Sequence, residues 1–193
     1  MDWLRLHDQG LEWFAGLVDG VGEGQWKEPT PCTDWDVRAL VNHNVYENLW
    51  AAELGAGHTI DEVGDRFDGD NLGDDASAAY RASADAARAS FDGPDSLEAP
   101  IAVSYGPISG EAYLRHRVMD LTIHGWDLAA ATGQGRDVPQ DLLEATALVV
   151  EEEQEMIRAS GVFATDVDVR EGEDRLERVL AITGRRVGWT PPA

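Results

Sequence analysis

EAYLRHRVMDLTIHGWDLAAAT, residues Glu111–Thr132, is the stretch around which the rest of the chain is organised. Its length predicts a helix of about six turns, at ~3.6 residues per turn. Within it, Asp120 and His124 lie four positions apart, so that both side chains share one helix face with Cβ atoms about 5–6 Å apart. A carboxylate and an imidazole in this arrangement can bind one metal ion from the same side. A third ligand must come from another segment.

His43 is the best candidate for this third ligand. It belongs to a helix predicted from about Asp34 to Leu54, and it lies on a stripe at helical spacing formed by Leu40, His43, Glu47, Trp50 and Leu54. This stripe places His43 on the inward face of the helix. A core histidine satisfied by a hydrogen bond is the alternative interpretation, but the inward Glu47 also needs a partner.

The residues before this helix indicate where it begins. Pro29 and Pro31 favour an extended approach, since a residue that precedes proline is biased away from helix. Thr33, with Asp36 three positions later, predicts an N-cap close to a capping box. Cys32 precedes the helix, where a thiol can have a lowered pKa. We favour a packed cysteine, because nothing else marks Cys32 as a nucleophile.

Helical periodicity extends over the other long segments of the chain. We predict helices at about 2–21, 75–91, 109–132 and 139–160 and a short helix at Glu173–Thr183, in addition to the one at 34–54. The segments 58–75 and 92–110 are predicted to be loops, and Ile101–Tyr105 and Val162–Val169 are predicted to be extended. Since no segment alternates steadily with a two-residue period, the sequence predicts an all-α protein.

The composition limits the classes of partner. The 193 residues carry a formal net charge of −22, and 43% of them are hydrophobic. This length fits one domain with a single core, which we place at residues 1–160, with 161–193 as a C-terminal extension packed on it. The strong negative charge disfavours nucleic acid and anionic membranes, and no apolar run reaches the ~20 residues that span a bilayer. The single cysteine and the lack of a recognisable signal segment favour the cytoplasm.

Three other histidines are expected at the surface. His7 has polar neighbours, His58 is in a glycine-flanked loop, and His116 falls off the stripe of the two ligand candidates in its helix.

Arg117 comes about one turn before Asp120, so an ordinary Arg–Asp helix pair is an alternative explanation for this aspartate.

Two motifs, in this order and separation, resemble the DinB/YfiT-like superfamily. They are PTPCTDWDVRALVNH, which ends at His43, and DLTIHGWDL, which begins at Asp120. The match is to the actinobacterial branch that contains mycothiol-dependent maleylpyruvate isomerase and metal-binding relatives, and it extends to the tail motif RLERVLAITGR that begins at Arg175. The resemblance implies an antiparallel four-helix bundle with a divalent metal ion held near one end by His43, Asp120 and His124.

The resemblance also implies a chemistry. Three protein ligands leave open positions for water or a substrate thiolate, as expected of a catalytic site. We expect zinc, with nickel or another first-row metal as the alternative, and mycothiol or another small thiol as cosubstrate. The isomerase has glutamate where Asp120 stands and a sizeable C-terminal domain, whereas about thirty residues follow the last long helix here. We therefore do not assign the maleylpyruvate isomerase reaction to this chain.

Two functions remain as hypotheses. The first is a metal- and thiol-dependent transferase or isomerase of a small electrophile, for which an anionic substrate needs a cationic groove near Arg117 or Arg115. The second is a non-catalytic metal or small-molecule binding module, in which a fourth ligand such as Glu47 closes the site. Glu47, Arg117 and Tyr113 are candidates for supporting or substrate-binding residues, and no catalytic residue of the chain is assigned. The expected partner is a small-molecule substrate, and a homodimer is compatible with both hypotheses.

Overall fold

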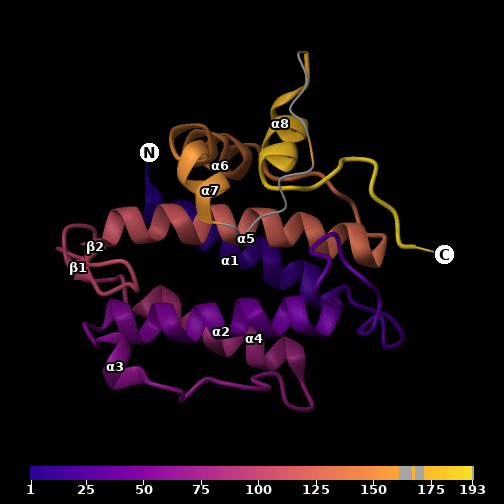
Figure 1. Cartoon of the computed structure of the whole chain (residues 1–193). Helices are drawn as coiled ribbons and strands as arrows, with labels where there is room; N and C mark the ends of the chain where they lie inside the picture. The colour runs from indigo at the N-terminus through magenta and orange to yellow at the C-terminus, as the bar shows by residue number, and fades with distance from the viewer. Residues whose placement is uncertain (161–166, 168–171, 193) are drawn as a thin grey trace.

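The computed structural model describes residues 1–160, 167 and 172–192, and it confirms the predicted all-α fold. Four long helices form the bundle: α1 (Trp3–Asp19), α2 (Val37–Gly55), α4 (Ala76–Ala89) and α5 (Gly110–Thr132). Helix α2 packs on α4 and α5, and α1 packs on α5 and α4. In Figure 1, α2 and α4 form the layer below α1 and α5.

Three further helices lie on the other side of α5: α6 (Gln140–Glu152), α7 (Gln154–Ser160) and α8 (Arg175–Ile182). Helix α6 packs on α5 and α1, and α8 packs on α6. Helix α8 confirms the short helix predicted near the C-terminal end, and Asp174 and Glu177 form its capping box. The extended stretch predicted at Val162–Val169 lies, except for Val167, outside the described residues.

The prediction of a single helix over 139–160 is wrong, because the helix is interrupted at Glu153. This residue ends α6 with φ −108° and ψ 13°, and its carboxylate turns toward α5, where it lies 2.9 Å from His116 Nε2. Glutamates follow one another closely on either side of it, and repulsion between like charges weakens a straight continuation of the helix.

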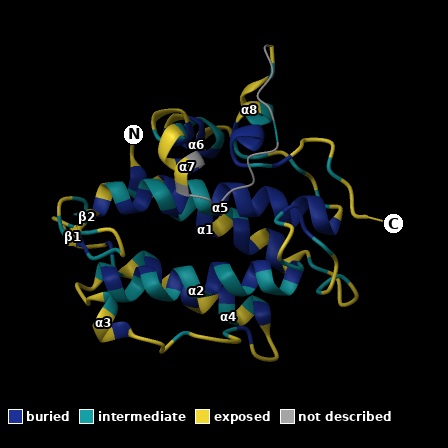
Figure 2. Cartoon of the chain, viewed as in Figure 1, coloured by how far each residue is buried: buried dark blue, intermediate teal, exposed yellow. Residues whose placement is uncertain are grey.

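Helix α5 is the centre of the molecule. Every residue from Leu121 to Thr132 is buried, because α1, α2 and α6 cover the helix from different sides (Figure 2). The contact with α1 is close at Gly125, where a Cβ atom would lie 2.2 Å from Cζ3 of Trp13. This packing places the predicted ligand His124 deep inside the protein.

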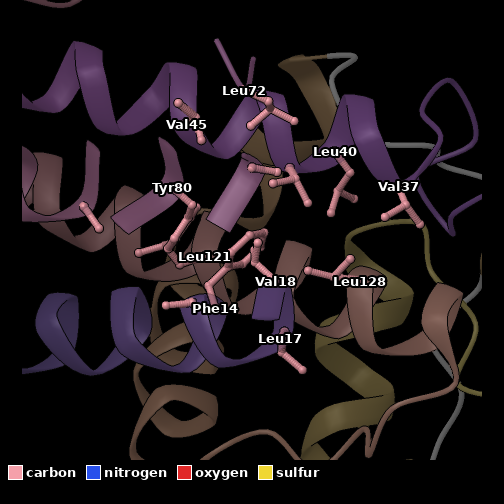
Figure 3. Packing of buried hydrophobic residues seen from close by; sticks show 14 of the residues in the cluster. Phe14, Leu17, Val18, Val37, Leu40, Val45, Leu72, Tyr80, Leu121 and Leu128 are labelled. Atoms are coloured by element: carbon pink, nitrogen blue, oxygen red, sulfur yellow. The ribbon is translucent and has the colours of Figure 1, made fainter. Parts of the chain in front are cut away.

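The core between the two layers of the bundle is apolar and is built from all four long helices and the loop before α4 (Figure 3). The rings of Phe14 and Tyr80 stack with centroids 5.0 Å apart. The labelled members are Phe14, Leu17, Val18, Val37, Leu40, Val45, Leu72, Tyr80, Leu121 and Leu128.

Helix α2 begins later than predicted, and Asp36 rather than Thr33 is its N-cap. The Asp36 carboxylate accepts a hydrogen bond from the backbone N–H of Ala39 at 2.8 Å. The preceding loop is held by Thr30, whose hydroxyl donates to the backbone carbonyl of Trp35 at 2.9 Å. These contacts keep 30–35 in a loop, so the helix cannot start before Asp36.

Two short elements occur in the segments predicted to be loops. Helix α3 (Ile60–Val63) is one turn with a capping box between Thr59 and Glu62, a pattern that the sequence contained. Strands β1 (Pro100–Ile101) and β2 (Ile108–Ser109) form an antiparallel pair. The predicted extended stretch Ile101–Tyr105 is therefore strand only at its first residue.

Within the described part of the chain, no helix combines the length and the apolar character needed to cross a membrane.

Candidate metal centre

The three predicted ligands meet between α2 and α5. His124 Nε2 lies 3.3 Å from Asp120 Oδ1, and His43 Nε2 lies 3.7 Å from the same oxygen. One ligand atom from each residue falls within 4.8 Å of the other two. His124 is buried, whereas His43 and Asp120 are half-buried, so that the group is open on one side.

The two distances to Asp120 Oδ1 fit a common metal ion. Ligand atoms placed at about 2.0–2.1 Å around a tetrahedral zinc ion lie about 3.3–3.4 Å from one another. The spacing of Asp120 Oδ1 from the two imidazole nitrogens is close to this value. Two imidazoles and one carboxylate also suit zinc or nickel better than calcium or magnesium, which prefer oxygen ligands.

Asp127, which the sequence reasoning missed, holds the buried side of His124. Its Oδ2 lies 3.1 Å from His124 Nδ1 and accepts a hydrogen bond from Arg185 Nη2 at 2.8 Å. Asp127 is fully buried and Arg185 is nearly so. A carboxylate on one ring nitrogen directs the other toward the ion, as in many metal sites. The three-residue spacing from His124 was the available signal for Asp127.

Asp120 is held from its other side by Arg117. The guanidinium donates to Asp120 Oδ2 at 2.7 Å and to Asn48 Oδ1 at 3.1 Å, and it lies 3.5 Å from the Glu47 carboxylate. The Arg–Asp helix pair therefore exists beside the group of three and does not replace it. Glu47 faces Arg117 and does not belong to the group of three.

Trp35, in the loop before α2, packs against both imidazoles, with its ring tilted by 32° from that of His43 and by 46° from that of His124. Its ring centroid lies 4.4 Å from that of His43 and 5.4 Å from that of His124. The sequence reasoning assigned no role to this tryptophan. Its partly buried indole therefore contacts both histidine rings.

Charges around the group govern its protonation. Burial opposes ionisation of Asp120, but the two histidines outweigh it and hold the pKa of this carboxyl well below its usual range. Burial likewise favours neutral His124, yet the carboxylates of Asp120 and Asp127 outweigh it and raise the pKa of His124 to about 9. The site thus attracts positive charge even without an ion.

A cavity of about 680 Å³ adjoins the open side of the group and includes His43 and Asp120 in its wall. Tyr113 and Arg117, predicted as supporting or substrate-binding residues, line it, as does Glu47. Most of the wall is apolar, with contributions from Val103, Met119, Met156 and Ile157.

The predicted cationic groove is not found among the described residues. Arg117 is only 3% exposed and is engaged by carboxylates, and Arg115 pairs with Glu152. Burial and pairing thus leave neither guanidinium available for an anionic substrate.

Two of the three histidines expected at the surface are not there. His116 lies on the same side of α5 as Asp120, because it is four positions before it, and it lines the cavity and contacts Glu153. His7 is 1% exposed and packs edge-on against Phe91, because α1 turns this side chain into the bundle. His58 is exposed, as predicted, and lies 2.6 Å from Glu53. Cys32 is packed, and burial raises the pKa of its thiol to about 11.

Comparisons with known proteins show the family and the fold of this chain. Residues 7–129 match the family model described as the mycothiol maleylpyruvate isomerase N-terminal domain. Two uncharacterized proteins of Mycobacterium tuberculosis, from strains CDC 1551 / Oshkosh and H37Rv, are each 33% identical over 142 residues, which is 74% of this chain and 74% of theirs.

Solved structures share the fold. A crystal structure of the mycothiol-dependent maleylpyruvate isomerase superposes with a TM-score of 0.62 over 81% of this chain and 71% of that one. A histidine-to-alanine mutant of that isomerase gives 0.60 over 77% and 68%. Both are 15% identical in sequence.

Proposed function

Because this chain belongs to the mycothiol maleylpyruvate isomerase N-terminal domain family, we propose that it is a metal- and thiol-dependent transferase or isomerase of a small electrophile. The resemblance to the mycothiol isomerase branch is thereby confirmed. The observation that carries the proposal is the group of His43, Asp120 and His124, whose ligand atoms lie within 4.8 Å of one another beside a cavity. Zinc fits this group best, with nickel as the alternative.

The surrounding residues support such a site. Asp127 directs His124, and Arg117 holds Asp120. Trp35 contacts both histidine rings. A divalent ion bound here would lower the pKa of a thiol or a water molecule at its open position. Mycothiol, or another small thiol, is the cosubstrate that we propose.

An open site favours the enzyme over the binding module. Among the described residues, Glu47 is the best candidate for a fourth ligand, but its carboxylate lies 3.5 Å from Arg117 Nη1. Glu47 also falls outside the group of three. Three protein ligands and an adjoining cavity are the arrangement of catalytic metal sites rather than structural ones.

The nucleophile of this reaction comes from a bound thiol or water rather than from the chain. Cys32 is the only cysteine, and burial raises the pKa of its thiol to about 11. At neutral pH this thiol is almost entirely protonated, and a thiol is a poor nucleophile compared with its thiolate.

The test uses protein purified without a nickel column. We expect about one divalent ion per chain, and thiol addition to an uncharged enone such as benzylideneacetone in the presence of mycothiol. His43→Ala and His124→Ala should each lose the ion and the activity while helical content by circular dichroism stays the same. Cys32→Ser should keep both.

His58→Ala is the matched control, because His58 pairs with Glu53 far along α2 from the proposed ligands. Full metal content in His124→Ala would contradict the ligand assignment. Stoichiometric metal without thiol addition to any electrophile would favour the non-catalytic binding module instead.

A further inference from the structure

A second set of polar groups lies in the same cavity, one helical turn from Asp120. His116 Nε2 lies 2.9 Å from Glu153 Oε2, and His116 Nδ1 lies 3.4 Å from the hydroxyl of Tyr105. All three residues line the cavity. They come from three elements: α5, the break between α6 and α7, and the loop between the two strands.

The contacts define the roles of the two ring nitrogens. A carboxylate only accepts, so Nε2–H of His116 donates to Glu153, and Nδ1 of the neutral ring is then an acceptor. Although Tyr105 is 66% exposed, partial burial of the group and the charge of Glu153 raise the pKa of its hydroxyl, which therefore remains a donor toward Nδ1. At 3.4 Å this contact is long, and a bound substrate can replace it.

Histidine and glutamate in this arrangement resemble the general base and the orienting carboxylate of a catalytic triad, with the bound thiol in place of the nucleophile. The carboxylate orients the imidazole and stabilises the imidazolium that forms when the ring accepts a proton. The side chains of His116 and Glu153 are 27% and 21% exposed, so both are partly shielded while remaining reachable from the cavity.

The rest of the cavity indicates which molecules it accepts. Val103, Met119, Met156 and Ile157 form an apolar wall. Carboxylates in the described lining outnumber the guanidinium of Arg117, which is already bound by Asp120 and Glu47. With a divalent ion bound, the charges of the three carboxylates, Arg117 and the ion cancel, so the lining has no excess positive charge to hold a dicarboxylate, and its apolar wall favours an uncharged molecule.

We propose that His116, held by Glu153, transfers the proton in this site, and that the cavity accepts an uncharged, apolar electrophile with one carbonyl group. The inference rests on the proposed function, because it needs a thiol cosubstrate, and it adds a residue and a substrate class to it.

The step is an addition of a thiol to a conjugated ketone. His116 Nδ1 accepts the thiol proton, and the sulfur forms a bond to the β-carbon while the C=C π pair moves toward the carbonyl as an enolate. The imidazolium, stabilised by Glu153, then returns the proton to the α-carbon. The product is a thioether ketone, and His116 is neutral again. The former double bond is a single bond in the adduct and can rotate; His116 then removes the α-proton, the C=C bond forms again, and the sulfur leaves and takes the proton back as the thiol, which gives the other isomer.

A structural role is the competing explanation for the His116–Glu153 contact, which ties α5 to the end of α6. The chain contains a matched control for it, since Arg115 and Glu152, each the preceding residue, tie the same two helices. Neither of those residues lines the cavity. A variant of Glu152 therefore tests the structural role of a contact between α5 and α6, and a variant of Glu153 tests the proton transfer.

The experiment measures mycothiol addition to benzylideneacetone with the metal-loaded full chain. General acid–base catalysis contributes about 10²–10⁴-fold, so we expect His116→Asn to lower kcat about 100-fold or more with little change in KM. The plot of kcat against pH for this variant should lack the limb that the imidazole produces in the wild type. The imidazole of His116 faces Glu153 and Tyr105, and Arg117 and Asp120 are the nearby charged residues on its own helix. Glu153→Gln should lower kcat about tenfold, and Glu152→Gln should not change it.

Calorimetry tests the substrate class without turnover. The saturated ketone benzylacetone should bind to the loaded protein, and succinate should not. An active wild type whose rate survives His116→Asn would overturn the inference and leave the proposed function standing. A metal-loaded wild type with no thiol addition contradicts the proposed function itself. Succinate binding, or no binding of the ketone, would overturn the substrate class.

Discussion

His124 and Asp127 are joined across the buried side of α5: Nδ1 of the histidine lies 3.1 Å from Oδ2 of the aspartate. The same aspartate accepts two hydrogen bonds from Arg185, which follows α8. The buried Asp127 carboxylate thereby connects the segment after α8 to the proposed metal centre.

Asp127→Asn should weaken metal binding without removing a ligand. The amide keeps the shape of the side chain, but it no longer attracts the Nδ1–H of His124 as strongly. Partners of this kind typically change metal affinity by about 10–100-fold. Competition with a zinc-binding dye would measure the change, and circular dichroism would show that the helices persist. An unchanged affinity would mean that Asp127 serves only the Arg185 ion pair.

The Asp127–Arg185 pair should behave as a buried ion pair in stability measurements. Arg185→Met leaves the fully buried Asp127 carboxylate without its main cation, which typically costs about 3–5 kcal/mol. Replacing both partners, as Asp127→Leu with Arg185→Met, should recover much of this loss. Urea unfolding of the three proteins would measure it. A double variant as unstable as the single one would show that Arg185 acts through other contacts.

Gly125→Ala should separate α1 from α5 next to the proposed ligands. The new Cβ would lie 2.2 Å from Cζ3 of Trp13, so the indole must move at a cost of about 1–3 kcal/mol. Gly16→Ala in α1 is the control, because nothing lies within 4 Å of its added Cβ. That variant should be neutral or stabilised by up to about 1 kcal/mol. Equal unfolding midpoints for the two variants would contradict the close packing.

His7 should make the fold sensitive to mild acid. Burial, assisted by the charges of Arg117 and Arg88, lowers the pKa of His7 from 6.5 to about 3. Between these values the unfolded chain binds a proton that the folded chain does not. The contribution of His7 to the free energy of unfolding is therefore at its full value above pH 6.5. It decreases by about 1.4 kcal/mol for each pH unit below 6.5.

The variant His7→Leu should have a flatter stability profile than the wild type between about pH 6.5 and 5. His58→Asn, at an exposed histidine, should keep the slope of the wild type. Urea unfolding at several pH values measures the slopes. Parallel profiles for His7→Leu and wild type would show that His7 is reachable by protons in the folded state.

The features that the sequence predicted correctly depend on local spacing. Helical periodicity is a property of consecutive residues, so the positions of the four long helices followed from it to within a few residues. The same is true of Asp120 and His124, which share a face because they are one turn apart. The stripe that contains His43 was enough to place this residue on the side of α2 that meets them. Metal binding by the three stays a prediction until an ion is measured.

The tertiary structure alone decided which polar side chains are covered. His7 and His116 have ordinary polar neighbours in sequence, yet α1 buries the first and the break at Glu153 brings a carboxylate to the second. Asp127 meets Arg185 across 58 positions. Burial and charge pairing are sums over contacts between distant segments, and such contacts exist only once the helices have packed. Local periodicity therefore determined the helices and two of the proposed ligands, whereas packing determined the charges and the cavity around them.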